Sequence, residues 1–267
     1  MSLILPQRGR IRQAAAAGAF DPNSLFSGGE DGFIIDPQTV GNLWQNDDFT
    51  TVISATGQEV KSITDASDAA RNIKIVSGAT GPTYEYDSGN DTHYLNFASS
   101  DQLETPVGVG LAPDDWSCYV GWYMPTGSTT NQPIIDGDGN GGGLIRVAQY
   151  NWIYASKARV VQFNSGSAAS STGSLSVDTA YVLKTKADET AATITAGLDG
   201  TWGTDTTSLT TPFPSPSQSI YIGKYRGPVS SYATGRLYYA LFINRLLNSG
   251  EDADLDTYIG NLIGKSI

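Results

Sequence analysis

The sequence predicts an all-β protein built from two facing antiparallel sheets, with one helix at its C-terminal end. Apolar and polar residues alternate along most of the chain after Thr92, which is the period of a strand with one buried face. The segments between these runs are rich in Gly, Ser, Asn and Asp, which favour turns. Charged residues make up 16% of the chain, below the usual value of about a quarter, which suits many short strands with a neutral polar surface.

The alternation assigns side chains to faces of the expected strands. Tyr94 and Asn96 lie on one face of their strand, and Leu95 and Phe97 lie on the other. An Asp-Gly pair at residues 199–200 predicts a tight hairpin. The expected strands cover residues 93–98, 116–124, 158–163, 180–187, 191–198, 219–223 and 236–243.

The C-terminal segment changes to a helical period. In residues 249–263, apolar side chains recur three and four residues apart, which predicts an amphipathic helix packed on the sandwich. Ser249 is the expected N-cap. Asp252 and Asp256 lie four residues apart on this helix, and we expect both on its solvated face.

A second helix is expected near the start of the sandwich. Residues 32–46 read as a short strand followed by a helix, with Asp36 as N-cap and Pro37 in the first helical position. Val40, Leu43 and Trp44 would then share one face of that helix, which predicts a core position for Trp44.

The first thirty residues differ from the rest in composition. They contain the basic cluster Arg8, Arg10 and Arg12, then a run of alanines, then a turn-rich stretch. We expect residues 1–30 to form an anchoring arm, with a disordered end as the alternative, and residues 31–267 to form one β-sandwich domain.

The net charge and the cysteine content exclude several classes of protein. The formal net charge is −11, so a nucleic acid is not an expected partner. The single cysteine, Cys118, excludes an internal disulfide and reads as a core residue. No apolar run is long enough to span a bilayer, and the first residues lack the apolar region of a signal peptide. We therefore expect a protein that stays in the cytosol or leaves it as part of an assembly.

The order of several motifs resembles a known family. "YLNFASSDQLETP", "DDWSCYVGWYMP", "ATITAGLDGTWG", "SIYIGKYRG" and the C-terminal strand and helix resemble concanavalin A-like, laminin-G-type jelly rolls. The block "SLFSGGEDGFIIDPQTVGNLW" resembles a leader found in structural proteins of tailed phages and prophages. The resemblance implies a sandwich of two curved sheets, often used to bind glycans, in a virion setting such as a head fibre, decoration protein or tail fibre.

The sequence offers little support for catalysis, although this fold also hosts glycosidases and polysaccharide lyases. A retaining glycosidase needs two carboxylates on one face, and Glu85 and Asp87 fit that requirement only within an expected turn region. The single histidine, His93, alternates with Leu95 and Phe97, and therefore reads as the end of a buried strand face. We accordingly predict a protein that is not an enzyme.

Aromatic residues are the candidates for glycan contact, because their ring faces pack against sugar C–H groups. Tyr150, Trp152 and Tyr154 share one strand face, and the alternation leaves open whether that face is the core or a stacking platform. Trp202, Tyr225 and Tyr232 lie in or beside turns and are the better candidates.

The stretch "DGDGNGGG" at residues 136–143 has two interpretations. Asp136, Asp138 and Asn140 match the first half of a calcium loop, but its twelfth position is Val147 instead of glutamate. A glycine-rich hairpin also explains the composition and is favoured. No other cofactor is expected.

The function expected from these features is adhesion. We expect a non-enzymatic virion structural protein that binds host cell-surface polysaccharide, and that contacts other virion proteins through its N-terminal arm. Two alternatives remain: a polysaccharide-degrading enzyme of the same fold, and a purely architectural subunit. We further expect a homo-oligomer on the virion surface, assembled in the bacterial cytoplasm.

Overall fold

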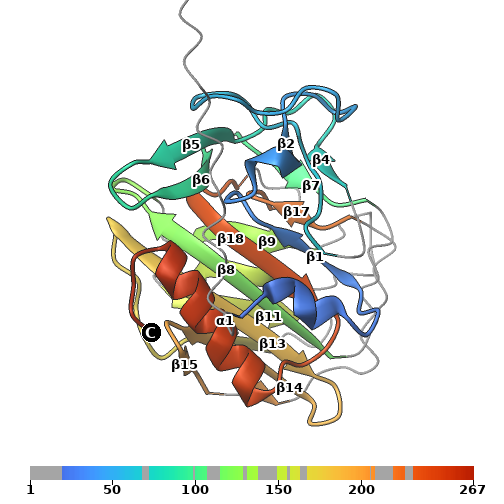
Figure 1. Cartoon of the computed structure of the whole chain (residues 1–267). Coiled ribbons are helices and arrows are strands. Elements are labelled where there is room, and N and C mark those ends of the chain that lie inside the picture. Colours follow the sequence, from blue (N-terminus) through green and yellow to red (C-terminus); the bar gives the residue numbers. More distant parts are fainter. Residues whose placement is uncertain are drawn as a thin grey trace, which may run out of the picture.

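The computed structural model describes most of the chain as two stacked antiparallel sheets, which confirms the predicted all-β sandwich (Figure 1). Every pairing between its strands is antiparallel. The described residues are 20–67, 72–98, 100–106, 115–128, 131–137, 149–154, 157–162, 167–204, 206–207, 219–225 and 231–267.

Sheet A and sheet B each have nine strands among the described residues, and sheet A carries the longest of these strands. Its order is β15 (Thr201–Trp202), β14 (Thr193–Leu198), β13 (Thr179–Asp188), β8 (Trp116–Met124), β18 (Gly235–Ile243), β6 (Thr92–Phe97) and β5 (Thr83–Asp87). Two short strands extend it: β1 (Gly32–Ile35) pairs with β18, and β16 (Thr206–Thr207) pairs with β14.

Sheet B covers the other side of the core. Its order is β12 (Ser167–Ser170), β11 (Lys157–Gln162), β10 (Gln149–Tyr154), β9 (Asn131–Asp136), β17 (Tyr221–Ile222), β7 (Leu103–Glu104), β4 (Ile73–Ile75), β3 (Ser62–Ile63) and β2 (Leu43–Trp44).

The main core lies between the two sheets and follows the predicted alternation. The face of β8 that begins at Trp116 is buried throughout, and Cys118 within it is a fully buried core residue, as expected. On β6, Leu95 and Phe97 enter the same core. Burial of such side chains is the dominant favourable term in folding, so this alternation sets the position of each strand.

The helix expected after Asp36 is not formed. The Asp36 carboxylate accepts hydrogen bonds from the Gln38 N–H (3.0 Å) and the Thr39 hydroxyl (3.0 Å), and so closes a turn. Only a short 3₁₀ turn, η2 (Val40–Asn42), follows. Strand β2 begins at Leu43, because pairing with β3 buries this leucine completely. Three apolar residues at helical spacing form too short a pattern to distinguish a helix from a turn followed by a strand.

The C-terminal helix α1 (Ser249–Leu262) is present, but its N-cap is Asn248 and not the predicted Ser249. The Asn248 side chain accepts hydrogen bonds from the backbone N–H groups of Gly250 (2.9 Å) and Glu251 (3.0 Å). The Glu251 carboxylate accepts one from the Asn248 N–H (2.9 Å), which completes a capping box. Asn is as good an N-cap as Ser, so residue type alone does not decide between these neighbours.

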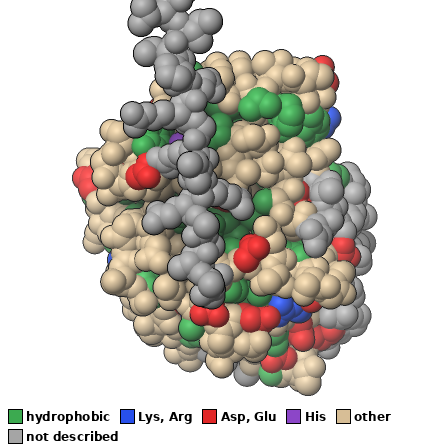
Figure 2. Space-filling model, in the orientation of Figure 1, with side chains coloured by type: hydrophobic (Ala, Val, Ile, Leu, Met, Phe, Trp, Pro, Cys, Tyr) green, Lys and Arg blue, Asp and Glu red, His purple; other side chains and the backbone are tan. Residues whose placement is uncertain are grey.

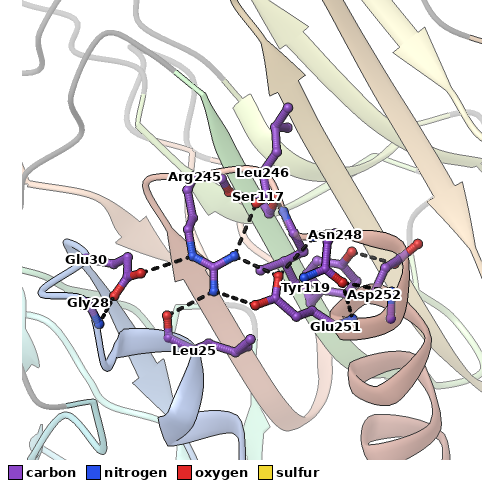
Figure 3. A network of polar contacts seen from close by, with 12 residues as sticks. Leu25, Gly28, Glu30, Ser117, Tyr119, Arg245, Leu246, Asn248, Glu251 and Asp252 are labelled. Atoms are coloured by element: carbon purple, nitrogen blue, oxygen red, sulfur yellow. Dashed lines mark hydrogen bonds and ion pairs between the residues drawn. The ribbon is translucent and has the colours of Figure 1, made fainter.

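Arg245 ties the start of α1 to the N-terminal segment (Figure 3). Its guanidinium binds both oxygens of Glu251 (2.7 and 2.9 Å) and donates to the carbonyl of Leu25 (3.1 Å). It also lies 3.3 Å from the Glu30 carboxylate. Residues 20–30 of the expected arm therefore pack on the sandwich, with Leu25 and Phe26 in the 3₁₀ turn η1 (Pro22–Phe26) buried. Residues 1–19 lie outside the described part of the chain.

Candidate functional site

The outer face of sheet A, which points away from the core, has two parts. Helix α1 lies across β8, β13 and β18 (Figure 1). It packs closely there, since a Cβ on Gly121 of β8 would lie 2.8 Å from the Ile259 side chain. Among the described residues, the other part of the face, toward β5 and β6, is not packed against α1 in this way and carries tyrosines and an arginine.

Strand register brings these tyrosines and the arginine together with the polar side chains of Asn96 and Glu85, from strands β5, β6, β8 and β18. Asn96 of β6 lies opposite Arg236 of β18, and Arg236 lies opposite Tyr123 of β8. On the neighbouring row, Tyr94 of β6 lies opposite Glu85 of β5. Their neighbours along each strand are buried in the core: Leu95, Phe97, Trp122 and Leu237. Because side chains alternate along a strand, the first set faces outward.

The Arg236 guanidinium is held between two tyrosine rings. Its central carbon lies 4.9 Å from the centre of the Tyr94 ring and 4.5 Å from that of the Tyr123 ring. The Tyr94 ring in turn packs on Tyr238, with 5.4 Å between ring centres. Cation–π attraction to these rings and a hydrogen bond to the Tyr238 side chain hold the guanidinium in place. We call these residues, Tyr94, Tyr123, Arg236 and Tyr238, the tyrosine–arginine surface.

Polar groups border this surface. Asp178 accepts hydrogen bonds from the Tyr123 hydroxyl (3.2 Å) and from the backbone N–H (2.9 Å) and hydroxyl of Thr126. The bonds from Thr126 hold the pKa of Asp178 below its ordinary value, so this carboxylate is ionised at neutral pH. Asn96 is exposed beside Arg236. Sugar hydroxyls bind to carboxylates and amides of this type.

The tyrosines keep their hydroxyl protons over the physiological pH range. Burial raises the pKa of Tyr94, and it raises that of Tyr238 in the same way, although Arg236 acts in the opposite direction. Burial and the bond to Asp178 also raise the pKa of Tyr123. The surface therefore presents one cation, neutral phenols and an amide, bordered by the ionised carboxylate of Asp178.

Two of the predicted glycan-contact residues, Tyr225 and Tyr232, lie just after β17, which is in the middle of sheet B. Tyr232 forms a bridge with Lys224, and the Tyr225 N–H donates to the Ser231 carbonyl (2.8 Å). The Lys224 ammonium lies 5.6 Å from the Tyr232 ring centre and 5.7 Å from that of Tyr221. Both predicted tyrosines are partly exposed, and they lie in the connection between β17 and β18, outside the tyrosine–arginine surface.

Trp202, a third predicted contact residue, packs beneath α1. Its indole N–H donates to Asp252 (2.8 Å), and the ammonium of Lys184 lies 4.4 Å from its ring centre. The Lys186 ammonium lies 4.6 Å from the same ring. Trp202 thus joins the helix to strand β15 and is only partly exposed.

The solvated positions expected for Asp252 and Asp256 are wrong. Lys184 of β13 is fully buried beneath α1, and its ammonium binds Asp252 (2.9 Å) and Asp256 (2.6 Å). Asp252 also accepts a hydrogen bond from the Tyr119 hydroxyl (2.5 Å). A buried charge requires a partner, so the helix turns these carboxylates inward. The helical period of α1 cannot show that a lysine lies under it.

This cluster predicts a pH dependence of stability. Burial raises the pKa of Asp256 from 3.8 to about 6. The folded protein therefore binds this proton more tightly than the unfolded chain does. The resulting stabilisation has its full value below pH 3.8, where both states are protonated, and is lost as the pH rises through about 6. The free energy of unfolding should therefore fall with rising pH relative to Asp256→Asn, by at most about 1.4 kcal/mol per pH unit. Urea unfolding at several pH values between about 3.5 and about 7 measures the difference. Parallel curves for the two proteins would contradict the prediction.

Several other predicted residues lie partly or wholly outside the described part of the chain. Asp138 and Asn140 lie outside it, and so do the side chains of Tyr150, Trp152 and Tyr154, whose backbone forms β10. Asp136 ends β9 and is fully buried. Among the residues that the structure describes, no three His, Cys, Asp or Glu side chains form a potential metal site.

The residues considered for catalysis have structural partners. The His93 ring is stacked between Tyr84 and Tyr86, and its Nδ1 lies 2.6 Å from the Tyr84 hydroxyl. Glu85 and Asp87 share the outward face of β5, as predicted from their spacing. The Asn90 side chain lowers the pKa of Asp87, which is opposite to the change that a general acid needs.

Sequence reasoning missed the tyrosine–arginine surface, although one signal was present. The alternation already assigned Tyr94 and Asn96 to the face opposite the buried Leu95 and Phe97. It carried no information on which strands are neighbours, because the β8–β18–β6 order joins segments that are far apart in the sequence. The same alternation, combined with that order, would have placed Arg236 between two tyrosines.

Comparison with known proteins supports the fold. No protein-family model and no curated protein sequence matches the chain. Similar solved structures include Trypanosoma rangeli sialidase in complex with sialic acid. Its sequence identity is 15% and its TM-score is 0.57, and the match covers 90% of this chain and 34% of the sialidase.

Within the described residues, no helix is both long and apolar enough to cross a membrane.

Two binding domains of toxins are also similar. The binding domain of Paraclostridial Mosquitocidal Protein 1 is 11% identical with a TM-score of 0.57, covering 78% of this chain and 55% of that one. The botulinum neurotoxin serotype D/C binding domain is 10% identical with a TM-score of 0.51, covering 82% and 51%. The chain therefore spans about a third of the sialidase and about half of the toxin domains.

These likenesses identify the fold as a concanavalin A-like β-sandwich of the jelly-roll type, in agreement with the resemblance noted in the sequence. The same fold serves enzymes and binding modules. The virion setting implied by the leader segment stays a prediction.

Proposed function

We propose that this protein is a carbohydrate-binding β-sandwich without catalytic activity, and that the tyrosine–arginine surface holds the glycan. The observation that carries the proposal is the position of Arg236 between the rings of Tyr94 and Tyr123 on an outward sheet face. Partly exposed aromatic rings offer apolar area to sugar rings, while the bordering amide and carboxylate bind hydroxyls.

The test is binding of the full chain to purified bacterial surface polysaccharides. Tyr123→Ala is expected to weaken binding about tenfold, because loss of one ring contact costs about 1.5 kcal/mol. Tyr94→Ala should act in the same direction. Tyr232→Ala is the matched control, because its ring contacts Lys224 beside β17 instead of Arg236, and it should bind normally. Normal binding by both sheet A variants, combined with loss of binding in the control, would contradict this location.

The enzyme alternative has one observation in its favour, the contact between the His93 ring and the Tyr84 hydroxyl. Tyrosine and histidine together serve as base and acid in proton-transfer chemistry. The same polysaccharides should therefore be assayed for new reducing or unsaturated ends. Our proposal predicts none, and product release that His93→Ala abolishes would establish the enzyme.

We further propose that the protein is a virion surface subunit, assembled in the bacterial cytoplasm and anchored through its N-terminal arm. The contacts of Arg245 with Leu25 and Glu30 hold residues 25–30 against the sandwich, so a deletion that tests the arm should end before them. Deletion of residues 1–19 leaves these contacts in place. The truncated chain is expected to bind polysaccharide and to lose association with purified particles; unchanged association would contradict an anchoring arm.

A further inference from the structure

We infer that the glycan bound at the tyrosine–arginine surface contains an acidic sugar, and that Arg236 binds its carboxylate. This inference rests on the proposed function and adds the chemical class of the ligand. It starts from the partners of the cations on this side of the molecule.

Three other cations around the outer face of sheet A are paired with carboxylates. Arg245 binds Glu251 and Glu30, and Lys265 lies 2.5 Å from Asp199. Lys184 has two aspartates. Arg236 and Lys186 differ, because within the described residues no carboxylate lies within ion-pair distance of either. Lys186 lies over the Trp202 ring, whereas Arg236 contacts the rings of Tyr94 and Tyr123 and hydrogen-bonds to the Tyr238 side chain.

The nearby carboxylates are already engaged. Asp178 accepts hydrogen bonds from Thr126 and from the Tyr123 hydroxyl. Asp87 accepts hydrogen bonds from the Asn90 side chain (2.8 Å) and the Gly89 N–H (2.8 Å). Neither lies within ion-pair distance of the guanidinium, although the charge of Arg236 contributes to lowering the pKa of Asp87. The protein thus presents an oriented positive group although its net charge is −11 and acidic side chains gather where α1 begins (Figure 2).

The geometry fits a carboxylate on a sugar ring. The Tyr94 and Tyr123 rings lie 4.9 and 4.5 Å from the guanidinium carbon, and the guanidinium also hydrogen-bonds to the Tyr238 side chain. A guanidinium carries several N–H donors, so donors remain for the two oxygens of a carboxylate. The same two rings provide apolar area for the sugar ring that carries the carboxylate, and the exposed Asn96 provides a donor and an acceptor for its hydroxyls.

Acidic neighbours make the surface selective. Glu85 lies directly opposite Tyr94, and Asp178 lies beside Tyr123. These carboxylates oppose the approach of a small multivalent anion such as phosphate. A single carboxylate surrounded by neutral hydroxyls is the ligand that satisfies both the cation and its acidic border.

The experiment compares a panel of uronate-containing capsular polysaccharides with the same polymers after carboxyl reduction. The full chain should bind at least one acidic polymer about tenfold more tightly than its reduced form, since a charged hydrogen-bonded pair contributes about that much. Arg236→Met should bind both forms equally. Arg236→Lys keeps the charge without the planar guanidinium, and should retain only part of the preference. Inorganic phosphate should not compete.

The outcomes separate this inference from the proposed function. Equal binding of acidic and reduced polymers by the unmodified chain, weakened by Tyr123→Ala, would overturn the acidic-sugar inference and leave glycan binding intact. Absence of binding to any polymer would overturn both. Lys224→Met, which removes a tyrosine-contacting cation beside β17, is the control and should retain the preference; loss of the preference in this variant would contradict the assignment to Arg236.

Discussion

Replacing Lys184 with methionine is expected to lower the free energy of unfolding by about 3–5 kcal/mol at pH 8, the cost of removing one partner from a buried ion pair. The ammonium is fully buried and lies 2.6 Å from Asp256 and 2.9 Å from Asp252. Without it, Asp252 keeps the bonds from Tyr119 and Trp202. Asp256 loses the Lys184 ammonium that binds its Oδ2, and within the described residues its Oδ1 has no hydrogen-bond partner.

Urea unfolding of the variant and of Lys186→Met measures this effect. Lys186 lies over the same Trp202 ring at 4.6 Å but is only partly buried, so its loss should cost less than about 1 kcal/mol. The penalty of Lys184→Met should also shrink below pH 6, where Asp256 takes up a proton. Similar stabilities for the two variants at pH 8 would show that the ion pair does not hold the helix.

Replacing Gly32 with alanine is expected to destabilise the fold by about 3 kcal/mol, a cost set by backbone strain together with overpacking. Gly32 begins β1, opposite Ile243 of β18, with a φ of +152°. A Cβ there would lie 2.0 Å from the Phe242 carbonyl oxygen, and so β1 would have to leave its place beside β18. That movement would also disturb Phe33, which is buried against Phe242.

Gly41→Ala is the control for this substitution. Gly41 has an ordinary negative φ, and a Cβ there meets no atom within 4 Å, so the change should stay within about 0.5 kcal/mol of neutral. Thermal unfolding of both variants gives the comparison. A Gly32→Ala protein as stable as Gly41→Ala would mean that β1 does not pair with β18 as described.

The sequence predicted the sandwich because its signal is local. Alternation along 116–124 and 236–243 marks a buried face wherever those strands lie, and the helical period at 249–263 is long enough to be distinct. The shorter pattern after Asp36 was ambiguous, because three apolar residues at helical spacing also fit a turn followed by a strand.

The sites were harder to predict, because they depend on contacts between distant segments. Asp252 and Asp256 look like a polar helix face until Lys184 of β13 is seen beneath them. Trp202 looks like an exposed turn residue until α1 covers it. Arg236 meets Tyr94 and Tyr123 only through strand order and register, which alternation does not encode.

The most direct test of glycan binding at the tyrosine–arginine surface is NMR of the full chain with isotope-labelled tyrosine rings. The ring signals, assigned with Tyr→Phe variants, are followed during titration with the acidic polysaccharide that binds best. We predict shifts for Tyr94 and Tyr123, which flank Arg236, and none for Tyr221 in β17 and Tyr232 beside it. Shifts confined to Tyr221 and Tyr232 would contradict the location and place the glycan beside β17.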